Sequence, residues 1–194
     1  DVRGCGVSTR NQRLSAIRSL AHFIGTHSPE HAHWCGEVRA IPVKRSPRPQ
    51  ITYLEKAEID ALLEAPDGGT SQGRRDYAVL LFLYNSGARA DEVAHVRISD
   101  LDLNDSANGS SVLLRGKGGK LRRCPLWSPT VAVLRPLIDS RDEVEHVFLN
   151  RRGLPLTRYG VHALVERHAD AAARKMPSLA KKRVSPHTIR HTTA

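Results

Sequence analysis

The sequence predicts a mostly helical α+β fold with one small antiparallel sheet. Apolar residues recur at helical spacing in several separate segments, whereas only residues 112–126 combine two apolar runs with a glycine-rich turn. The chain has 194 residues, of which 40% are hydrophobic, and it can therefore bury one full-sized core plus a smaller element. We expect one main domain, which carries the sheet, preceded by part of a helical domain.

The N-terminal part is expected to contribute an amphipathic helix, followed by a linker. Its apolar positions at helical spacing are Leu14, Ile17, Leu20, Ala21 and Ile24. Residues 42–50 contain three prolines together with Lys44 and Arg45, a composition typical of an extended basic linker. We therefore divide the chain into a helical part at residues 1–41, the linker at 42–50 and the main domain at 51–194.

The first half of the main domain reads as helices followed by the sheet. Thr52 and Glu55 predict a capping box for a helix that ends before Pro66. The apolar stripe at Tyr77, Leu80, Leu81 and Tyr84 predicts a second helix, which Gly87 terminates. A short helix follows Arg89, residues 98–103 begin the sheet, and residues 112–126 form a β-hairpin.

The second half alternates helices with one more strand. Periodicity predicts a helix over residues 130–138, a strand over 146–149 and a long helix over 157–174. The pattern leaves residues 171–184 open between a loop and a frayed helix. A last helix begins at Ser185-Pro186, because a serine hydroxyl caps free backbone N–H groups and proline tolerates the first helical position.

Two short stretches about a hundred residues apart are candidates for one phosphate-binding site. The first contains Arg89, which emerges just after the expected helix stop at Gly87. In the second, His187 and Arg190 lie three residues apart on one face of a first helical turn, where the helix dipole favours an anion. Arginine binds two phosphate oxygens at once and stays charged at any working pH. The hairpin turn adds a mobile lysine, Lys117 or Lys120.

Together, Gly87-Ala88-Arg89, the Gly116-Lys117-Gly118 hairpin and the box from His187 to His191 resemble the catalytic domain of the tyrosine recombinases, or phage-integrase family. Residues 9–18 look like the last part of that family's helical core-binding domain. The resemblance implies a tyrosine-recombinase-like catalytic fold that acts on duplex DNA. It also implies site-specific recombination and integration by strand breakage and rejoining through a 3′-phosphotyrosyl intermediate, with four protomers on the DNA and no cofactor.

The resemblance assigns a role to each matching residue. It implies that Arg89 and Arg190 clamp the scissile phosphate, that Lys117 protonates the departing 5′ oxygen and that His187 assists proton transfer. It implies a supporting role for His191. Glu92, three residues after Arg89, either orients that guanidinium or simply caps the helix.

The family's nucleophilic tyrosine is not matched in this chain, because no tyrosine follows Tyr159. The family pattern places it a few tens of residues beyond Arg190, so we expect a fragment that is inactive alone. Two alternatives stay open. The chain could be a non-catalytic module that binds duplex DNA, or a neighbouring protomer could supply the tyrosine.

Composition favours a polyanionic partner. The net charge is +10, and no acidic residue follows Asp170. An aromatic fraction of 5% fits stacking on unpaired bases poorly and favours contact with a duplex backbone. The basic residues expected to contact DNA are Arg10, Arg13, Lys44, Arg45, Lys120, Lys181, Lys182 and Arg183.

The remaining residues exclude other classes. No apolar run approaches the ~20 residues that a membrane span needs. Three widely spaced cysteines argue against a disulfide framework and favour a reducing cytoplasm. His31, His33 and Cys35 match no standard zinc spacing, so we expect no metal.

Overall fold

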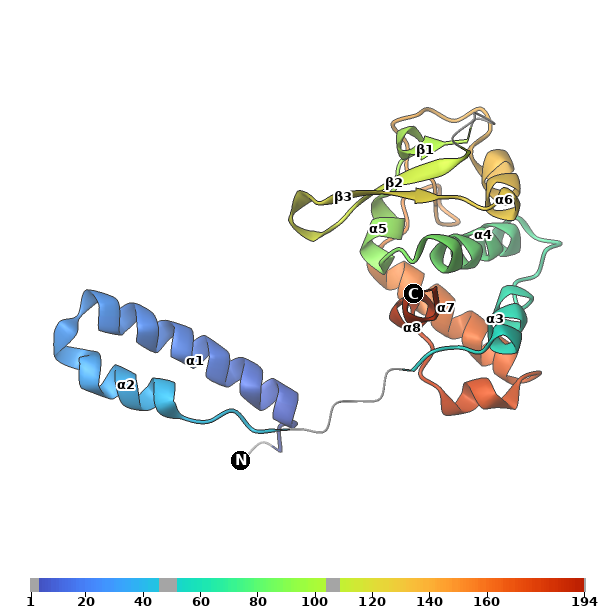
Figure 1. The fold of residues 1–194 in the computed structure, drawn as a ribbon. Coiled ribbons are helices and arrows are strands. Elements are labelled where there is room, and N and C mark those ends of the chain that lie inside the picture. The colour runs from blue at the N-terminus through green and yellow to red at the C-terminus, as the bar shows by residue number, and fades with distance from the viewer. Residues whose placement is uncertain (1–3, 46–51, 104–108, 194) are drawn as a thin grey trace. The chain divides into compact units, whose positions relative to one another are not determined.

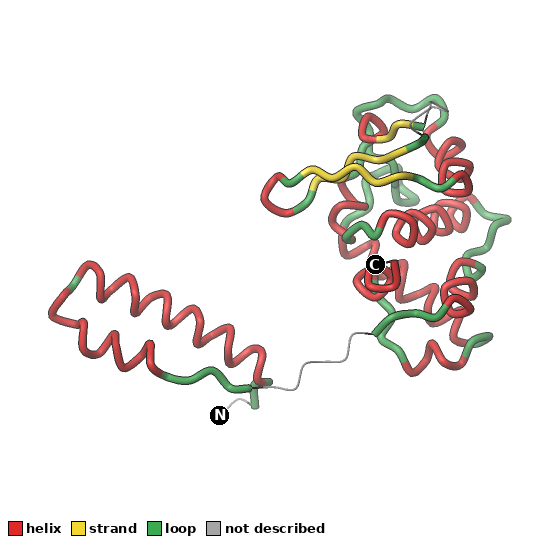
Figure 2. The backbone as a smooth tube through the Cα atoms, viewed as in Figure 1, coloured by secondary structure: helices red, strands yellow, loops and turns green. Residues whose placement is uncertain are grey.

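A computed structural model describes residues 4–45, 52–103 and 109–193, apart from the side chain of Lys117. The chain forms two compact units, at residues 1–50 and 51–194 (Figure 1). Helices dominate both units, and the single sheet belongs to the second (Figure 2). The predicted fold class is therefore confirmed.

The first unit is a helical hairpin. The expected helix is present as α1 (Val7–His27), and a short 3-10 turn, η1 (Pro29–His31), leads into α2 (Ala32–Ala40). The two helices run side by side in opposite directions (Figure 1). They approach closely at Gly25, where an added Cβ would lie 3.2 Å from the Cβ of Cys35. Periodicity did not predict α2, because its only buried residue is Cys35.

The second unit carries six α-helices within the described residues. They are α3 (Lys56–Leu63), α4 (Ser71–Ser86), α5 (Ala90–His95), α6 (Ser128–Ile138), α7 (Arg158–Ala173) and α8 (Pro186–Thr193). Helix α4 forms the centre of the core, since Leu80, Phe82 and Leu83 are fully buried. It packs against α6 and α8, while α7 covers α3 and α5.

The sheet has three antiparallel strands in chain order. They are β1 (Leu101–Asp102), β2 (Ser111–Arg115) and β3 (Leu121–Pro125). The register pairs Val112 with Cys124 and Arg115 with Leu121, which confirms the predicted hairpin. A 3-10 turn, η3 (Lys117–Gly119), forms its tip (Figure 2). The sheet lies on one side of α4, and α3, α7 and α8 lie on the other (Figure 1).

Three details differ from the expectation or complete it. The capping box starts at Glu55, whose backbone N–H binds the Glu58 carboxylate at 2.8 Å, rather than at Thr52. The predicted strand over 146–149 is wrong, because His146 and Leu149 make only isolated bridges, to Arg97 and Pro155. The open segment 171–184 contains the end of α7 and a 3-10 turn, η4 (Pro177–Lys181).

Within the described ranges, no helix is both long enough and apolar enough to cross a membrane. Nor do three or more histidine, cysteine, aspartate or glutamate side chains gather there in a way that could hold a metal ion. Cys35 points into the α1–α2 contact, whereas His31 and His33 are exposed.

Candidate functional site

The site is built on a sharp turn between α4 and α5. Gly87 ends α4 in the left-handed conformation, with φ of +56°, and its N–H binds the carbonyl of Leu83 at 3.0 Å. Two residues earlier, the side-chain amide of Asn85 donates to the Pro125 carbonyl and accepts from the Trp127 N–H, at 3.2 and 2.8 Å. The helix end is thereby tied to the end of β3.

Arg89 leaves this turn as the N-cap residue of α5 and binds a buried carboxylate. Its Nη1 donates to Oε1 of Glu92 at 2.8 Å, and its backbone N–H donates to Oε2 at 2.9 Å. Glu92 is only 3% exposed, whereas the Arg89 side chain is 53% exposed. Glu92 therefore both caps the helix and orients the guanidinium, which combines the two roles left open by the sequence.

A second arginine, from the sheet, joins the Arg89–Glu92 pair. Arg122 of β3 donates through Nη2 to Oε2 of Glu92 at 2.8 Å and to the carbonyl of Gly87 at 3.4 Å. Sequence reasoning did not single out Arg122. Strand alternation could have indicated it, because Arg122 and Cys124 share one face of β3.

Helix α8 brings the second half of the site to the same turn. The Ser185 hydroxyl accepts the Thr188 N–H at 3.3 Å, as the predicted cap requires. Ile189 is buried, and the Thr193 hydroxyl donates to the carbonyl of Tyr84 at 2.9 Å. With α8 docked on α4 in this way, Arg190 donates through Nη1 to the Gly87 carbonyl.

His187 and His191 form an imidazole pair on the exposed side of α8. Their Nε2 atoms lie 2.9 Å apart, so one ring donates and the other accepts. Partial burial lowers the pKa of His187, and the positive charges of His191, Arg190 and Arg89 lower it further. These influences favour the neutral form of the His187 imidazole over the protonated form.

The site is strongly electropositive. Burial and the neighbouring guanidiniums of Arg89 and Arg122 lower the pKa of Arg190, which still remains charged. The hairpin reaches the same place, because a Cβ added to Gly116 would lie 3.4 Å from Oε1 of Glu92 and 3.7 Å from Nη1 of Arg89. The side chain of the next residue, Lys117, lies outside the described part of the structure.

The sequence of the second unit matches a known family. The model of the phage integrase family covers residues 52–194. The chain belongs to the phage integrase family.

Named relatives agree with this membership. The y4rD protein of Sinorhizobium fredii is 39% identical over 98% of this chain and 69% of its own length. The tyrosine recombinase XerC of Pelobacter propionicus is 34% identical over 96% of this chain and 59% of its own length. The XerH site-specific recombinase, solved bound to a palindromic difH substrate, shares the fold with a TM-score of 0.60 at 23% identity, over 78% of this chain and 43% of that one. The chain thus spans about 60–70% of the two curated relatives.

Other basic residues predicted for this phage integrase chain differ in exposure. Arg13, Lys44, Arg45, Lys120, Lys181 and Arg183 are exposed, and Arg10 is half-buried. Lys182 has an internal partner: its Nζ donates to Oε2 of the buried Glu58 at 2.6 Å and to the Tyr53 carbonyl at 3.0 Å.

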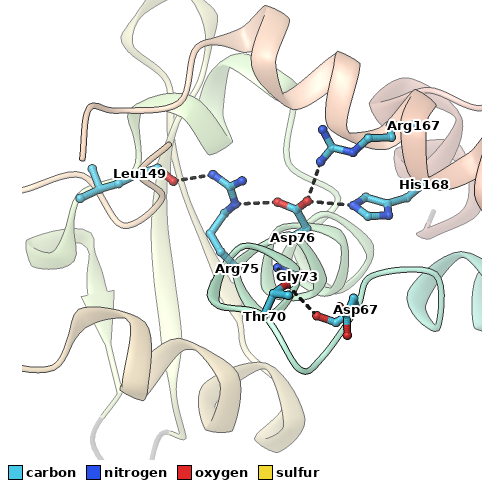
Figure 3. A network of polar contacts seen from close by, with 8 residues as sticks. All are labelled: Asp67, Thr70, Gly73, Arg75, Asp76, Leu149, Arg167 and His168. Atoms are coloured by element: carbon cyan, nitrogen blue, oxygen red, sulfur yellow. Dashed lines mark hydrogen bonds and ion pairs between the residues drawn. The ribbon is translucent and has the colours of Figure 1, made fainter. Parts of the chain in front are cut away.

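Sequence reasoning also missed a buried polar cluster that fixes α4 against α7 (Figure 3). Asp76 is 2% exposed and accepts hydrogen bonds from Arg75 and Arg167 at 2.6 Å, and it binds Nε2 of His168 at 2.9 Å. Arg75 reaches onward to the carbonyl of Leu149 at 2.5 Å. The cluster stabilises the helix whose far end is the Gly87 turn.

Proposed function

We propose that the protein containing this chain is a tyrosine recombinase that breaks and rejoins duplex DNA at specific sites. The observation that carries the proposal is the meeting of Arg89 and Arg190 at the Gly87 turn, beside His187, whose pKa is lowered by burial and by these neighbouring charges. Two fixed guanidiniums at one place suit a phosphodiester, because each can bind two of its oxygens.

In this reaction a tyrosine oxygen attacks the DNA phosphorus and the bond to the 5′ oxygen breaks. The products are a 3′-phosphotyrosyl link and a free 5′ hydroxyl. Negative charge grows on the non-bridging oxygens in the five-coordinate transition state, where Arg89 and Arg190 stabilise it more than in the ground state. His187 assists transfer of the tyrosine proton, and Lys117 protonates the departing 5′ oxygen. Attack by another strand's 5′ hydroxyl reverses these steps and rejoins the DNA.

The nucleophile, in this proposal, is none of the four tyrosines in the chain. The Tyr159 hydroxyl accepts from Arg158 at 2.5 Å on α7, and the Tyr84 ring packs edge-on against Trp127. Tyr77 lines an apolar pocket of about 560 Å³, and Tyr53 is exposed beside Lys182. The attacking tyrosine would come from another part of the protein or from a neighbouring protomer in a four-protomer assembly on DNA.

The basic surface supports a duplex DNA partner. The net charge is +10, and most of the predicted contacts are exposed: Arg13, Lys44, Arg45, Lys120, Lys181 and Arg183. XerH, a site-specific recombinase with the same fold, is bound to a palindromic difH substrate in its solved structure. Release of counterions from the DNA backbone would drive this binding.

The test uses the full-length protein and a nicked duplex that traps the covalent intermediate. The wild-type protein should form a protein–DNA adduct. Arg190→Ala should form it about 10²- to 10³-fold more slowly, as expected on removing one donor to a developing oxyanion, while it retains most of its DNA affinity. Arg123→Gln is the control for loss of an arginine charge, because Arg123 of β3 binds the Ser111 hydroxyl at 2.9 Å instead of a group of the proposed site. DNA binding without an adduct from the wild-type protein would instead indicate a non-catalytic binding module.

A further inference from the structure

Arg122 touches two groups that also bind the proposed phosphate-binding arginines. Its Nη2 lies 2.8 Å from Oε2 of Glu92, the carboxylate whose Oε1 binds Arg89. The same nitrogen lies 3.4 Å from the carbonyl of Gly87, which accepts from Arg190. One side chain of β3 therefore contacts an acceptor for each of the two arginines.

We propose that Arg122 is a positioning residue, which sets the directions of Arg89 and Arg190 through Glu92 and Gly87. The proposal rests on the proposed function. It does not require Arg122 to touch the DNA phosphate itself.

Electrostatics explains why Glu92 needs a second partner. A carboxylate that is 3% exposed is costly to leave unpaired. If Arg89 were its only cation, every N–H that Arg89 turned toward a phosphate would weaken that pairing. Arg122 on Oε2 keeps the carboxylate compensated, so Arg89 can share its five donors between Glu92 and DNA. Two guanidiniums bound to one carboxylate, together with the nearby Arg190, also leave the site net positive, as an anion requires.

Position in the fold adds a mechanical role. Arg122 pairs with Leu114 across the hairpin, so its contacts tie the strand pair to the α4–α5 turn. Gly116, at the start of the hairpin tip, already lies against the Arg89–Glu92 pair. Arg122 thereby holds the hairpin that carries Lys117 in a fixed position relative to the two arginines.

The experiment compares Arg122→Gln, Arg122→Lys and the control Arg123→Gln in the full-length protein. We measure the single-turnover rate of adduct formation, the duplex Kd and the melting temperature. Arg122→Gln should cleave about 100-fold more slowly, the scale expected for a small misplacement of reacting groups. Its Kd should stay within about threefold, since its phosphate-contacting residues remain. Arg122→Lys keeps the charge and should recover part of the rate, and Arg123→Gln should match the wild type.

A double-mutant cycle with Glu92→Gln tests the route of action. If Arg122 works through Glu92, then Arg122→Gln should cost much less in the Glu92→Gln background than in the wild type. Additive losses overturn the proposal. The proposal is also overturned if Arg122→Gln cleaves at the wild-type rate. It is overturned as well if the lower melting temperature of Arg122→Gln, and thus a smaller folded fraction, accounts for its whole loss of rate.

A spectroscopic measurement separates this proposal from the proposed function. In the DNA-free protein, Arg122→Gln should shift the guanidinium Nε–Hε resonances of Arg89 and Arg190, and Arg123→Gln should leave them in place. If the wild-type protein forms no adduct, the proposed function fails but these shifts still report positioning. Unchanged resonances in Arg122→Gln overturn the positioning role, whatever the activity.

Discussion

Arg190 of α8 donates a hydrogen bond to the carbonyl of Gly87, which lies 103 residues earlier in the chain. The carbonyl is available because Gly87 ends α4 with φ of +56° and turns its backbone out of the helical direction. A glycine that ends a helix thus also orients a guanidinium. Because Gly87 has both roles, substituting it tests the site more specifically than substituting a side chain that only packs.

Gly87→Ala should reduce cleavage more than it reduces stability. An added Cβ would find ordinary contacts, the nearest being Thr193 Cγ2 at 3.7 Å, so the cost comes from forcing alanine to a positive φ, about 1 kcal/mol. The relaxed backbone would move the carbonyl that holds Arg190. We expect a small loss in urea stability and a much larger loss in adduct formation by the full-length protein.

Gly153→Ala is the matched control for this backbone strain. Gly153 has φ of +73° and open space around its Cβ direction, and its backbone N–H binds the carbonyl of Asn150 at 3.0 Å within its own turn. The variant should lose similar stability and keep its cleavage rate. Equal losses of activity in the two variants would contradict the role given to the Gly87 carbonyl.

Asp76→Asn should destabilise the second unit and make its free energy of unfolding depend less on pH in acid. Burial alone would raise the pKa of Asp76, but the hydrogen bond with His168 and the charges of Arg75 and Arg167 hold it below its ordinary value. A depressed carboxyl pKa stabilises the fold above the unfolded pKa, roughly 3.9, and that stability is lost as pH falls through the folded value. At pH 7 the variant should lose about 3 kcal/mol, the scale for breaking a buried ion pair.

Urea unfolding between pH 7 and pH 3 measures both effects of Asp76→Asn. The difference between wild type and variant should be largest near neutral pH and shrink in acid. Two stability curves that stay parallel down to the lowest pH would show that the Asp76 carboxylate does not supply this acid sensitivity.

The pKa of His187 should rise when duplex DNA binds. In the free protein, burial and then the charges of His191, Arg190 and Arg89 hold this pKa below its ordinary value. A bound phosphate adds negative charge beside the ring and favours the protonated form. Histidine Cε1 resonances, titrated by NMR with and without DNA, report the change.

His146 is an internal control, because burial and the charges of Arg97 and His95 lower its pKa. Movement of both histidines alike would indicate a general effect of DNA rather than a phosphate at the site.

Local patterns in the sequence predicted the parts of this site that depend on neighbouring residues. The stop at Gly87, the cap at Ser185 and the glycine-rich hairpin each follow from short-range backbone chemistry. Contacts between distant residues left no such signal. Asp76 meets Arg167 and His168 across 91 and 92 residues, and Arg122 reaches Glu92 across 30. The segment 146–149 is apolar enough for a strand, but it found no continuous edge to pair with and makes only isolated bridges.

Lys181 and Lys182 should respond in opposite ways to substitution by alanine. Lys181 is exposed, so its loss should lower the slope of log K against log salt by about 0.9, the contribution of one phosphate contact to B-DNA, and leave stability almost unchanged.

Lys182 binds the buried Glu58 at 2.6 Å. Burial alone would raise the pKa of Glu58, but the hydrogen bonds from Lys182 and Ser178 hold it below its ordinary value. Lys182→Ala would leave that carboxylate with one partner fewer in the core, so it should destabilise the protein by about 3 kcal/mol. Because the ammonium of Lys182 is turned inward, its loss should leave the salt slope close to that of the wild type.

Two measurements separate the two residues. DNA affinity is measured between 50 and 200 mM salt, the range in which counterion release is readily seen, and stability is measured by urea unfolding. A reduced salt slope in Lys182→Ala, with unchanged stability, would mean that Lys182 exchanges Glu58 for DNA when the complex forms.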